Sequence, residues 1–313
     1  MSAPRTRVQR RPVHGVLLLD KPLGLSSNQA LQKASWLLRA EKAGHTGTLD
    51  PLATGVLPLC FGAATKFGQL QLDADKTYEA TIRLGVKTST GDAEGEVVAT
   101  RPVPPLDAAR IEEVAQRFTG AIRQVPPMHS ALKKDGRPLY ELARAGQEVE
   151  REPRDAVVRS LSLQAAAPEV LMLVATVSKG TYIRTLGEDI GEALGCGGHL
   201  TSLRRVASGG IAVDRCITLD RLEALGEDER MAHLHPVSSL LDSHTPVTLG
   251  EDDAGRFLSG LRRRGDWPDG DRIAVYSSNS LLGTGHVKAG ELIPGRLLSP
   301  IEIQQILQSA NAS

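Results

Sequence analysis

The stretch GHTGTLDPLATGVLP, residues 44–58, is the most unusual segment of the chain. It lies in a region dense in glycine and proline and predicts an extended loop that passes into a strand. Asp50 stands in this loop beside two leucines, and apolar neighbours partly remove water from a carboxylate. A carboxylate held in this way can act as a nucleophile or general base, or it can close an Asx-turn before Pro51. The residues alone leave both interpretations open.

The segments on either side predict alternating strands and helices. Residues 16–19 form a short apolar run typical of a buried strand, which the turn at Lys21 and Pro22 ends. Ser26 and Gln29 fit a capping box that starts a helix over residues 27–40. Because the later elements alternate irregularly, we predict an α/β (α+β) domain with a mixed, mostly antiparallel sheet and flanking helices. Further strands are expected at residues 76–86, 157–163 and 170–177, and further helices at residues 107–118, 139–145 and 181–194.

The two ends of the chain differ from its middle. Residues 1–12 are rich in arginine and predict a flexible basic tail, and residues 13–240 form the main domain. The polar, proline-bearing stretch 233–246 suits a linker. Residues 246–313 then predict a small C-terminal β-barrel domain. Its strands are expected at residues 272–277, 281–286 and 291–298.

The composition restricts the classes of function. The 313 residues carry 37 basic and 37 acidic side chains, so binding to nucleic acid would need a segregated basic face. Aromatic residues make up 3% of the chain, too few for a repeated base-stacking platform. No apolar run approaches the ~18 residues of a membrane span, no secretory leader is recognisable, and the three cysteines form no CxxC. We therefore expect a cytoplasmic protein without membrane association.

Two further segments carry side chains suited to chemistry. In residues 178–186 a strand ends and a helix begins, which puts Tyr182 and Arg184 near unpaired N–H groups that favour anions. Arg184 can pair with a buried carboxylate or a phosphate, or form an ordinary surface ion pair. Tyr78 and Leu203 are core residues by default. The histidines of the 233–246 stretch lack partner carboxylates or cysteines, so no metal site is expected.

Five segments, taken in order, resemble the TruB family of bacterial tRNA pseudouridine synthases. They are GVLLLDKPLGLSSNQALQ, GHTGTLDPLATGVLP, DKTYEA, SKGTYIRTLGEDIG and CGGHLTSLRR, which together run from residue 15 to residue 205. The resemblance implies the pseudouridine-synthase fold with a PUA-like RNA-binding domain at residues 246–313. It also implies an enzyme that isomerises uridine 55 in the T-loop of tRNA to pseudouridine.

The resemblance further implies roles for single residues. Asp50 corresponds to the essential aspartate, Arg184 to the arginine that pairs with it, and Tyr78 to the tyrosine that stacks on the base; these three form the catalytic set. The substrate-binding set is His45, Tyr78, Tyr182, Leu203, Lys21 and Pro22.

The reaction breaks the N1–C1′ bond of uridine, rotates the bound uracil and joins C5 to C1′. It is an intramolecular transfer, so the resemblance implies neither a cofactor nor a metal. The uridine must first be turned out of the folded RNA loop, at a cost of a few kcal/mol. Asp50 could attack the sugar, add to the uracil ring or take a proton from the sugar, and the sequence does not choose among them. We expect a monomer that acts on tRNA without a protein partner, with basic residues of 137–159 and 262–264 on one positive face.

Three alternatives remain at this stage. A guide-RNA-dependent synthase of the dyskerin type would share the aspartate loop. A tRNA-folding chaperone with secondary catalysis would bind and release RNA modestly. A carboxylate glycosidase acting on free nucleosides is disfavoured, because the motif lacks a second carboxylate.

Overall fold

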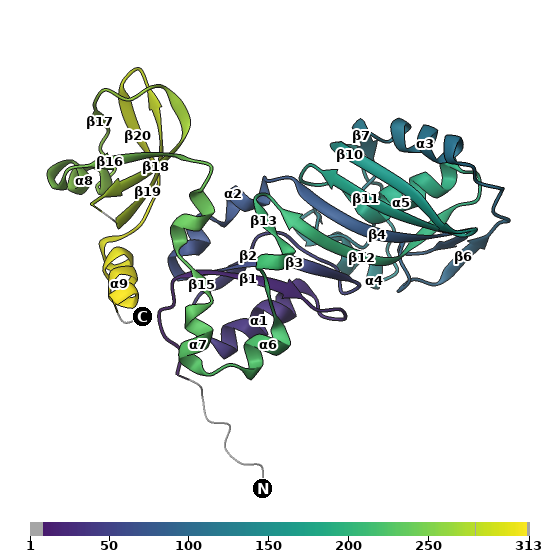
Figure 1. The fold of residues 1–313 in the computed structure, drawn as a ribbon, viewed down its shortest axis with the longest axis horizontal. Helices are drawn as coiled ribbons and strands as arrows, with labels where there is room; N and C mark the ends of the chain where they lie inside the picture. Colours follow the sequence, from purple (N-terminus) through teal and green to yellow (C-terminus); the bar gives the residue numbers. More distant parts are fainter. Residues whose placement is uncertain (1–8, 279, 312–313) are drawn as a thin grey trace, which may run out of the picture.

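The computed structural model describes residues 9–278 and 280–311 and divides into two lobes of unequal size (Figure 1). The larger lobe is built on an 11-stranded sheet and the smaller, C-terminal lobe on a 5-stranded sheet. Within these residues, no helix combines the length and the apolar character needed to cross a membrane.

The large sheet is mixed and mainly antiparallel, as the sequence predicts. Its main path runs β14-β1-β3-β12-β4-β11-β10-β7, and only the β1–β14 and β12–β3 pairs along it are parallel. The strands are β1 (Gly15–Lys21), β2 (Ala43–His45), β3 (Ala53–Phe61), β4 (Lys76–Leu84), β7 (Gly120–Gln124), β10 (Arg154–Ala167), β11 (Val170–Val177), β12 (Gly198–Ser208), β13 (Ile211–Ala212), β14 (Ile217–Thr218) and β15 (Leu234–His235). Two small hairpins lie apart from it: β5 (Val86–Thr88) with β6 (Val97–Thr100), and β8 (Lys133–Lys134) with β9 (Arg137–Pro138).

Helices flank this sheet. They are α1 (Ser27–Leu37), α2 (Gly68–Leu72), α3 (Ala108–Arg117), α4 (Leu139–Arg144), α5 (Ile183–Ala193), α6 (Leu219–Ala224) and α7 (Glu227–Ala232), with 3₁₀ turns η1 (Gly62–Lys66), η2 (Val213–Arg215) and η3 (Val237–Leu241). The predicted capping box is present, since Ser26 accepts from the Gln29 N–H and Gln29 accepts from the Ser26 N–H. Helix α1 ends three residues earlier than predicted, because Arg39 takes a left-handed φ of +54° that a helix does not continue.

Strand β4 shows why the alternating pattern predicted a half-buried strand. Tyr78, Ala80, Ile82 and Leu84 all point into the main apolar core, while the residues between them face outward. Helix α5 packs closely on β12 over this core. A Cβ on Gly191 would collide with the backbone of Gly197, so a residue without a side chain is required there.

The structure corrects the expectation that the chain becomes ordered only after Pro12. Residues 1–8 of the predicted tail lie outside the described residues. Arg11 already pairs with the body of the protein: its N–H donates to the Arg39 carbonyl at 2.8 Å, and its guanidinium contacts Glu227 at 3.1 Å.

The predicted linker at 233–246 is also wrong. Strand β15 pairs with β1, and Val237, Leu240 and Leu241 of η3 are buried in an apolar cluster to which both lobes contribute. The sequence misled because the apolar residues of η3 are few and lie among polar ones, so that a packed 3₁₀ turn resembled a polar connection.

The C-terminal lobe is a curled five-stranded sheet, a half-barrel that fits a PUA-like domain. Its order is β16-β18-β19-β20-β17, and it lacks the closure that a complete barrel would have. The elements are β16 (Thr245–Leu249), α8 (Glu251–Leu258), β17 (Arg263–Arg264), β18 (Gly270–Ser277), β19 (Ser280–Lys288), β20 (Glu291–Leu297) and α9 (Pro300–Asn311). Helix α9 is tied to the large lobe by an ion pair between Lys66 and Glu302 at 2.6 Å. The ring of His14 adds a hydrogen bond to the Gln305 side chain at 2.9 Å.

Candidate active site

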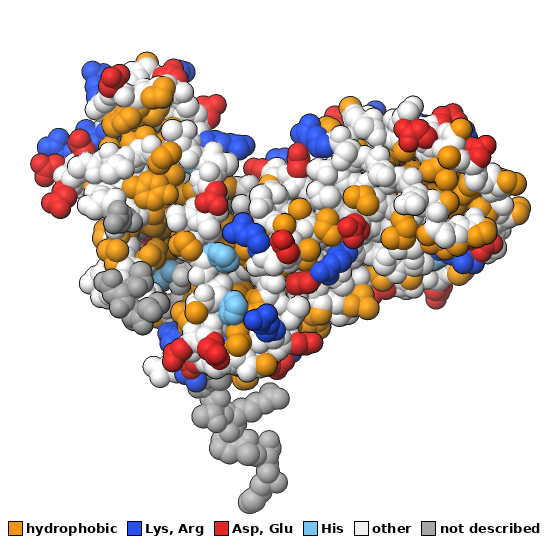
Figure 2. Space-filling view, in the orientation of Figure 1, with side chains coloured by type: hydrophobic (Ala, Val, Ile, Leu, Met, Phe, Trp, Pro, Cys, Tyr) orange, Lys and Arg blue, Asp and Glu red, His pale blue; other side chains and the backbone are white. Residues whose placement is uncertain are grey.

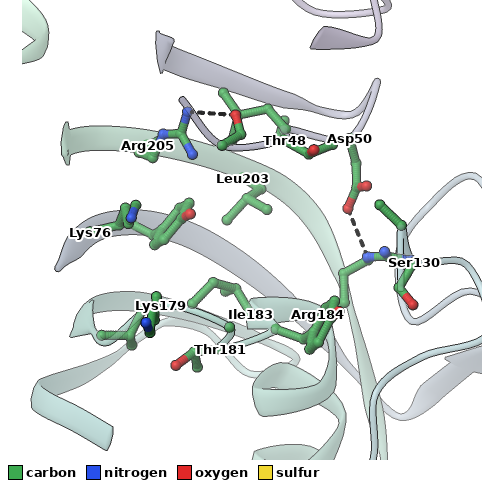
Figure 3. A pocket seen from close by; sticks show the side chains of 18 of the residues that line it. Thr48, Asp50, Lys76, Ser130, Lys179, Thr181, Ile183, Arg184, Leu203 and Arg205 are labelled. Atoms are coloured by element: carbon green, nitrogen blue, oxygen red, sulfur yellow. Dashed lines mark hydrogen bonds and ion pairs between the residues drawn. The ribbon is translucent and has the colours of Figure 1, made fainter. Parts of the chain in front are cut away.

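A cavity of about 620 Å³ opens over the middle strands of the large sheet, where the loop after β2 faces the start of α5 (Figure 3). Its walls come from residues 47–53, from β4 and β12, from residues 177–184 and from residues 130–132. Five of the predicted site residues line this cavity together, although they are far apart in the sequence: Asp50, Tyr78, Tyr182, Arg184 and Leu203.

The loop that carries Asp50 is held by neutral hydrogen bonds from the segment before and within α1. The Leu49 N–H donates to the Ser27 hydroxyl at 2.7 Å, and that hydroxyl donates back to the Leu49 carbonyl at 3.1 Å. The Gly24 N–H donates to the Pro51 carbonyl at 2.8 Å. These bonds lie immediately before and after Asp50, so they fix its backbone and leave its side chain free for other contacts.

Arg184 holds the Asp50 side chain from the opposite wall. Its Nε lies 3.0 Å from Oδ2 of Asp50, and a second guanidinium nitrogen lies 3.6 Å from Oδ2 of Asp92. The remaining donors go to the carbonyls of Thr90 at 3.0 Å and His129 at 2.7 Å. Since Arg184 sits in the second position of α5 with only 6% of its side chain exposed, its orientation is fixed from four directions.

The electrostatics of Asp50 reflect two opposing effects. Burial raises the pKa of its carboxyl group and nearby Asp92 adds to this, whereas Arg184 and Lys21 lower it; the net shift is upward. About 36% of the side-chain surface is accessible, and Asp50 lines the cavity, so a ligand in the cavity can reach the carboxylate. A carboxyl group with a shifted pKa in a cavity is typical of a functional site.

The other walls are apolar and aromatic. Leu203 of β12 pairs with Ala80 of β4, two residues from Tyr78, and Leu203 projects into the space between the Asp50 loop and the start of α5 (Figure 3). Tyr182 precedes α5 and is held through its backbone, whose N–H donates to the Gln124 side chain at 3.0 Å. A carboxylate at the edge of an apolar, aromatic cavity can receive a flat ring and act on the group attached to it.

Lys21, Pro22 and His45 do not line this cavity. The ammonium of Lys21 donates to the carbonyls of Pro22 at 2.8 Å and Leu25 at 2.5 Å, behind the Asp50 loop. Burial lowers the pKa of Lys21 to about 8, with Asp50 acting in the opposite direction. His45 lies at the end of β2, and its Nδ1 is buried without a hydrogen-bond partner.

Two buried cations of the cavity wall were missed by the sequence reasoning. Arg205 is 1% exposed, and its Nε donates to the Val56 carbonyl at 2.6 Å. The ammonium of Lys76 donates to three carbonyls, of Gln71, Leu72 and Ala74, at 3.1, 2.7 and 2.6 Å. Both residues lie inside segments that carry the family resemblance, but a lysine or arginine next to a strand is expected to be surface-exposed by default.

Asp92 was missed for a related reason, because it belongs to an acidic turn that reads as solvated. It is 2% exposed, and its carboxylate accepts from the Glu94 N–H at 3.1 Å and contacts Arg184. Within the described chain, no group of three or more His, Cys, Asp or Glu side chains has the arrangement of a metal site.

Ion pairs offset part of the charge of the predicted positive face. Three consecutive arginines, the two of β17 and the one before it, pair with acidic residues of the small lobe. Arg262 and Arg264 pair with Glu291, and Arg263 pairs with Asp253. Arg159 of the other group pairs with Asp75 in the large lobe. That the basic residues of 137–159 and 262–264 share one face stays a prediction.

Comparisons with known proteins agree with this geometry. Residues 35–183 match the family described as TruB family pseudouridylate synthase (N terminal domain), and residues 184–242 match the tRNA pseudouridylate synthase B C-terminal domain. In solved structures, a chain of a Cbf5–Nop10–Gar1 complex superposes with a TM-score of 0.71 at 25% identity, covering 93% of this chain and 86% of that one.

Two relatives are similar over nearly their whole length. A Verminephrobacter eiseniae protein named tRNA pseudouridine synthase B is 64% identical, over 98% of this chain and 95% of its own. A Cupriavidus taiwanensis protein of the same name is 57% identical, over 93% of this chain and 96% of its own. The resemblance inferred from the sequence motifs is therefore confirmed: the chain belongs to the TruB family of pseudouridylate synthases and is an enzyme of that class.

Proposed function

We propose that this enzyme isomerises uridine 55 in the T-loop of tRNA to pseudouridine. The observation that carries the proposal is the Asp50 carboxylate, held 3.0 Å from Arg184 at the edge of a cavity walled by Tyr78 and Leu203. The relatives named tRNA pseudouridine synthase B support tRNA as the substrate.

In this proposal the uridine is turned out of the RNA loop into the cavity. Tyr78 stacks on the uracil and Leu203 closes its other side, so that the base can rotate while it remains bound. Tyr182 completes the wall beside Arg184. His45, at the end of β2, contacts the RNA next to the extruded nucleotide, while Lys21 and Pro22 support the Asp50 loop from behind.

Asp50 acts in its ionised form, as a nucleophile towards the sugar or the uracil ring or as the base that takes a sugar proton. Arg184 keeps the carboxylate charged against the desolvation that raises its pKa. The atoms of the product are those of the substrate, so no electron or group leaves the complex and no cofactor takes part. The half-barrel of residues 246–313 contributes to RNA binding, and the enzyme works as a monomer without a protein partner.

The test uses a tRNA transcript tritiated at uracil C5, because joining C5 to C1′ displaces that hydrogen. Wild type is expected to release label equivalent to one T-loop uridine. Asp50→Asn is expected to release none while still binding tRNA. Asp228→Asn, an exposed aspartate on α7, is the matched control and should behave as wild type. Retained release in Asp50→Asn would overturn the role of Asp50, and no release by wild type would overturn the reaction.

A guide-RNA-dependent synthase remains the second candidate. It is favoured by one observation, the similarity of this chain to a chain solved in a Cbf5–Nop10–Gar1 complex. The same assay separates the two, since the tRNA-acting enzyme releases label without added RNA or protein. Label that appears only when a second RNA or protein is supplied would favour the guided reaction.

A further inference from the structure

A second cavity, of about 410 Å³, lies at the junction of the two lobes and plays no part in the proposed catalysis. Its floor is apolar and includes Leu18, Leu70, Ile211 and Leu240. Its rim comes from both lobes, from residues 71–74, 209–215, 235–244 and, in the small lobe, Arg272. Figure 2 shows histidine and basic side chains near this junction, on the face where the two lobes meet.

Two arginines on the rim are free to bind an anion. Among the described residues, neither Arg215 nor Arg272 forms an ion pair or hydrogen bond, and both are exposed. Each lies beside a histidine of the same cavity. Burial is the main cause of the lowered pKa values of His235 and His244. The positive charge of Arg215 lowers the pKa of His235 further, and that of Arg272 lowers the pKa of His244 further.

Acidic residues only partly offset this charge. Asp73 of the rim is already paired with Lys179 at 2.8 Å, and Asp242 stands near His235. With Asp73 paired, the two arginines exceed Asp242 by one positive charge. This equals the single negative charge of one phosphodiester group, so the cavity matches that group in charge.

The cavity also contains an unused hydrogen-bonding group. Among the described residues, Oε1 of Gln71 is buried without a hydrogen-bond partner, and Gln71 lines the cavity. An unpaired buried acceptor is costly unless something fills it. A small rotation of the Gln71 side chain would turn its oxygen towards a ligand hydroxyl. A ribose 2′-hydroxyl both donates and accepts, which distinguishes RNA from DNA at such a site.

The second cavity adjoins the first. Leu72 and Lys76 line the active-site cavity, whereas Gln71, Asp73 and Ala74, in the same short segment, line the cavity between the lobes. Lys179 connects them, because it lines the active-site cavity while its ammonium contacts Asp73. An RNA whose uridine enters the first cavity can therefore extend its backbone over this segment towards the second.

We propose that the cavity between the lobes binds one ribose-phosphate unit of the RNA substrate, with Arg215 and Arg272 on the phosphate and Gln71 on the 2′-hydroxyl. The inference rests on the proposed function, which supplies the RNA. It makes the junction of the lobes a second contact that orients the RNA while the uridine occupies the active site.

The test measures the dissociation constant for a tRNA transcript over a range of salt concentrations. Arg215→Gln with Arg272→Gln is expected to weaken binding at least about tenfold at low salt. It is also expected to reduce the slope of log affinity against log salt by about 0.7–0.9, the effect of one lost phosphate contact. Gln71→Leu should weaken binding without changing the slope, because it removes a neutral contact. Arg221→Gln, an exposed arginine on α6, is the control and should change neither.

Two further measurements distinguish the outcomes. Replacing both arginines with lysine should restore most of the slope, which a loss of folding would not allow. C5-tritium release at subsaturating tRNA should fall in the glutamine variants by about the same factor as the affinity. Unchanged affinity and slope in an enzyme that still releases label would overturn this site and leave the proposed function intact. If those variants instead weakened only the binding of uridine monophosphate, the cavity would serve a free nucleotide, and the assignment to RNA would be wrong.

Discussion

Replacing Arg184 with methionine tests whether this arginine is the electrostatic centre of the site. The change leaves the Asp92 carboxylate, whose side chain is 3% exposed, without its guanidinium contact, and removing one partner of a buried ion pair costs about 3–5 kcal/mol. The carbonyls of Thr90 and His129 each lose a donor, at about 1 kcal/mol apiece. The free energy of unfolding should therefore fall by about 5–7 kcal/mol, a large part of the stability of an ordinary domain.

A second substitution separates charge from shape. Adding Asp92→Asn to Arg184→Met removes the uncompensated buried charge, so the double variant should be more stable than the single one by about 2 kcal/mol. Urea unfolding measures both, and the expected signature is a shift of the midpoint at constant slope. Activity should stay at least about 100-fold below wild type in both variants, because Asp50 is no longer positioned. A single-variant loss under about 2 kcal/mol, or no recovery in the double variant, would show that Arg184 does not compensate the buried charge of Asp92.

Two other predictions follow from the same region. The raised pKa of Asp50 means that the folded protein binds the proton of this carboxyl group more tightly than the unfolded chain does. At a pH above the folded pKa, ionisation of Asp50 therefore lowers the free energy of unfolding. This loss disappears as the pH falls below the ordinary value of 3.8. Asp50→Asn should therefore be more stable than wild type at pH 7 and lose this advantage on acidification, as thermal unfolding against pH would show; a variant less stable at pH 7 would contradict it. Gly55 has a φ of +102°, and a Cβ there would collide with the backbone of Arg205, so Gly55→Ala should lower stability by roughly 2–6 kcal/mol. Gly24 is the control: its φ is +84°, but a Cβ there would meet open space, so Gly24→Ala should lose only the stability that backbone strain costs. If urea unfolding gave equal losses of stability for the two variants, the collision at Gly55 would be relieved in the folded protein.

The parts of the fold that the sequence predicts are those determined by local pattern. The alternation of β4 and the capping box before α1 depend on residues close in the chain, and both are confirmed. The packed η3 turn was missed because it is buried against β1, α2 and η1, which lie far away in the sequence, and no local pattern carries such contacts. The C-terminal helices α8 and α9 were missed for a similar reason, since α9 is held by distant partners such as Lys66.

The candidate site divides in the same way. The sequence brought Asp50 and Arg184 forward because each stands in an unusual loop or at a helix start. It could not foresee the burial of Arg205 or Asp92, since a charged residue is surface-exposed unless folding supplies its partners. The carbonyl that accepts from Arg205 belongs to β3, which the strand order brings beside β12, whereas those that accept from Lys76 come from the turn just before it.

Different contacts fix the position of Asp50 and influence its charge. The hydrogen bonds from Ser27 and Gly24 are neutral, so they set the position of the carboxylate without favouring either protonation state. Arg184 acts on the charge, and it is itself held by the carbonyls of Thr90 and His129 as well as by acids. Because these tethers do not involve the Asp50 carboxylate, we expect the guanidinium to stay in place if the charge on Asp50 changes in the proposed reaction. A site preorganised in this way avoids reorganising its charged groups during the chemical step, which is where electrostatic stabilisation contributes most.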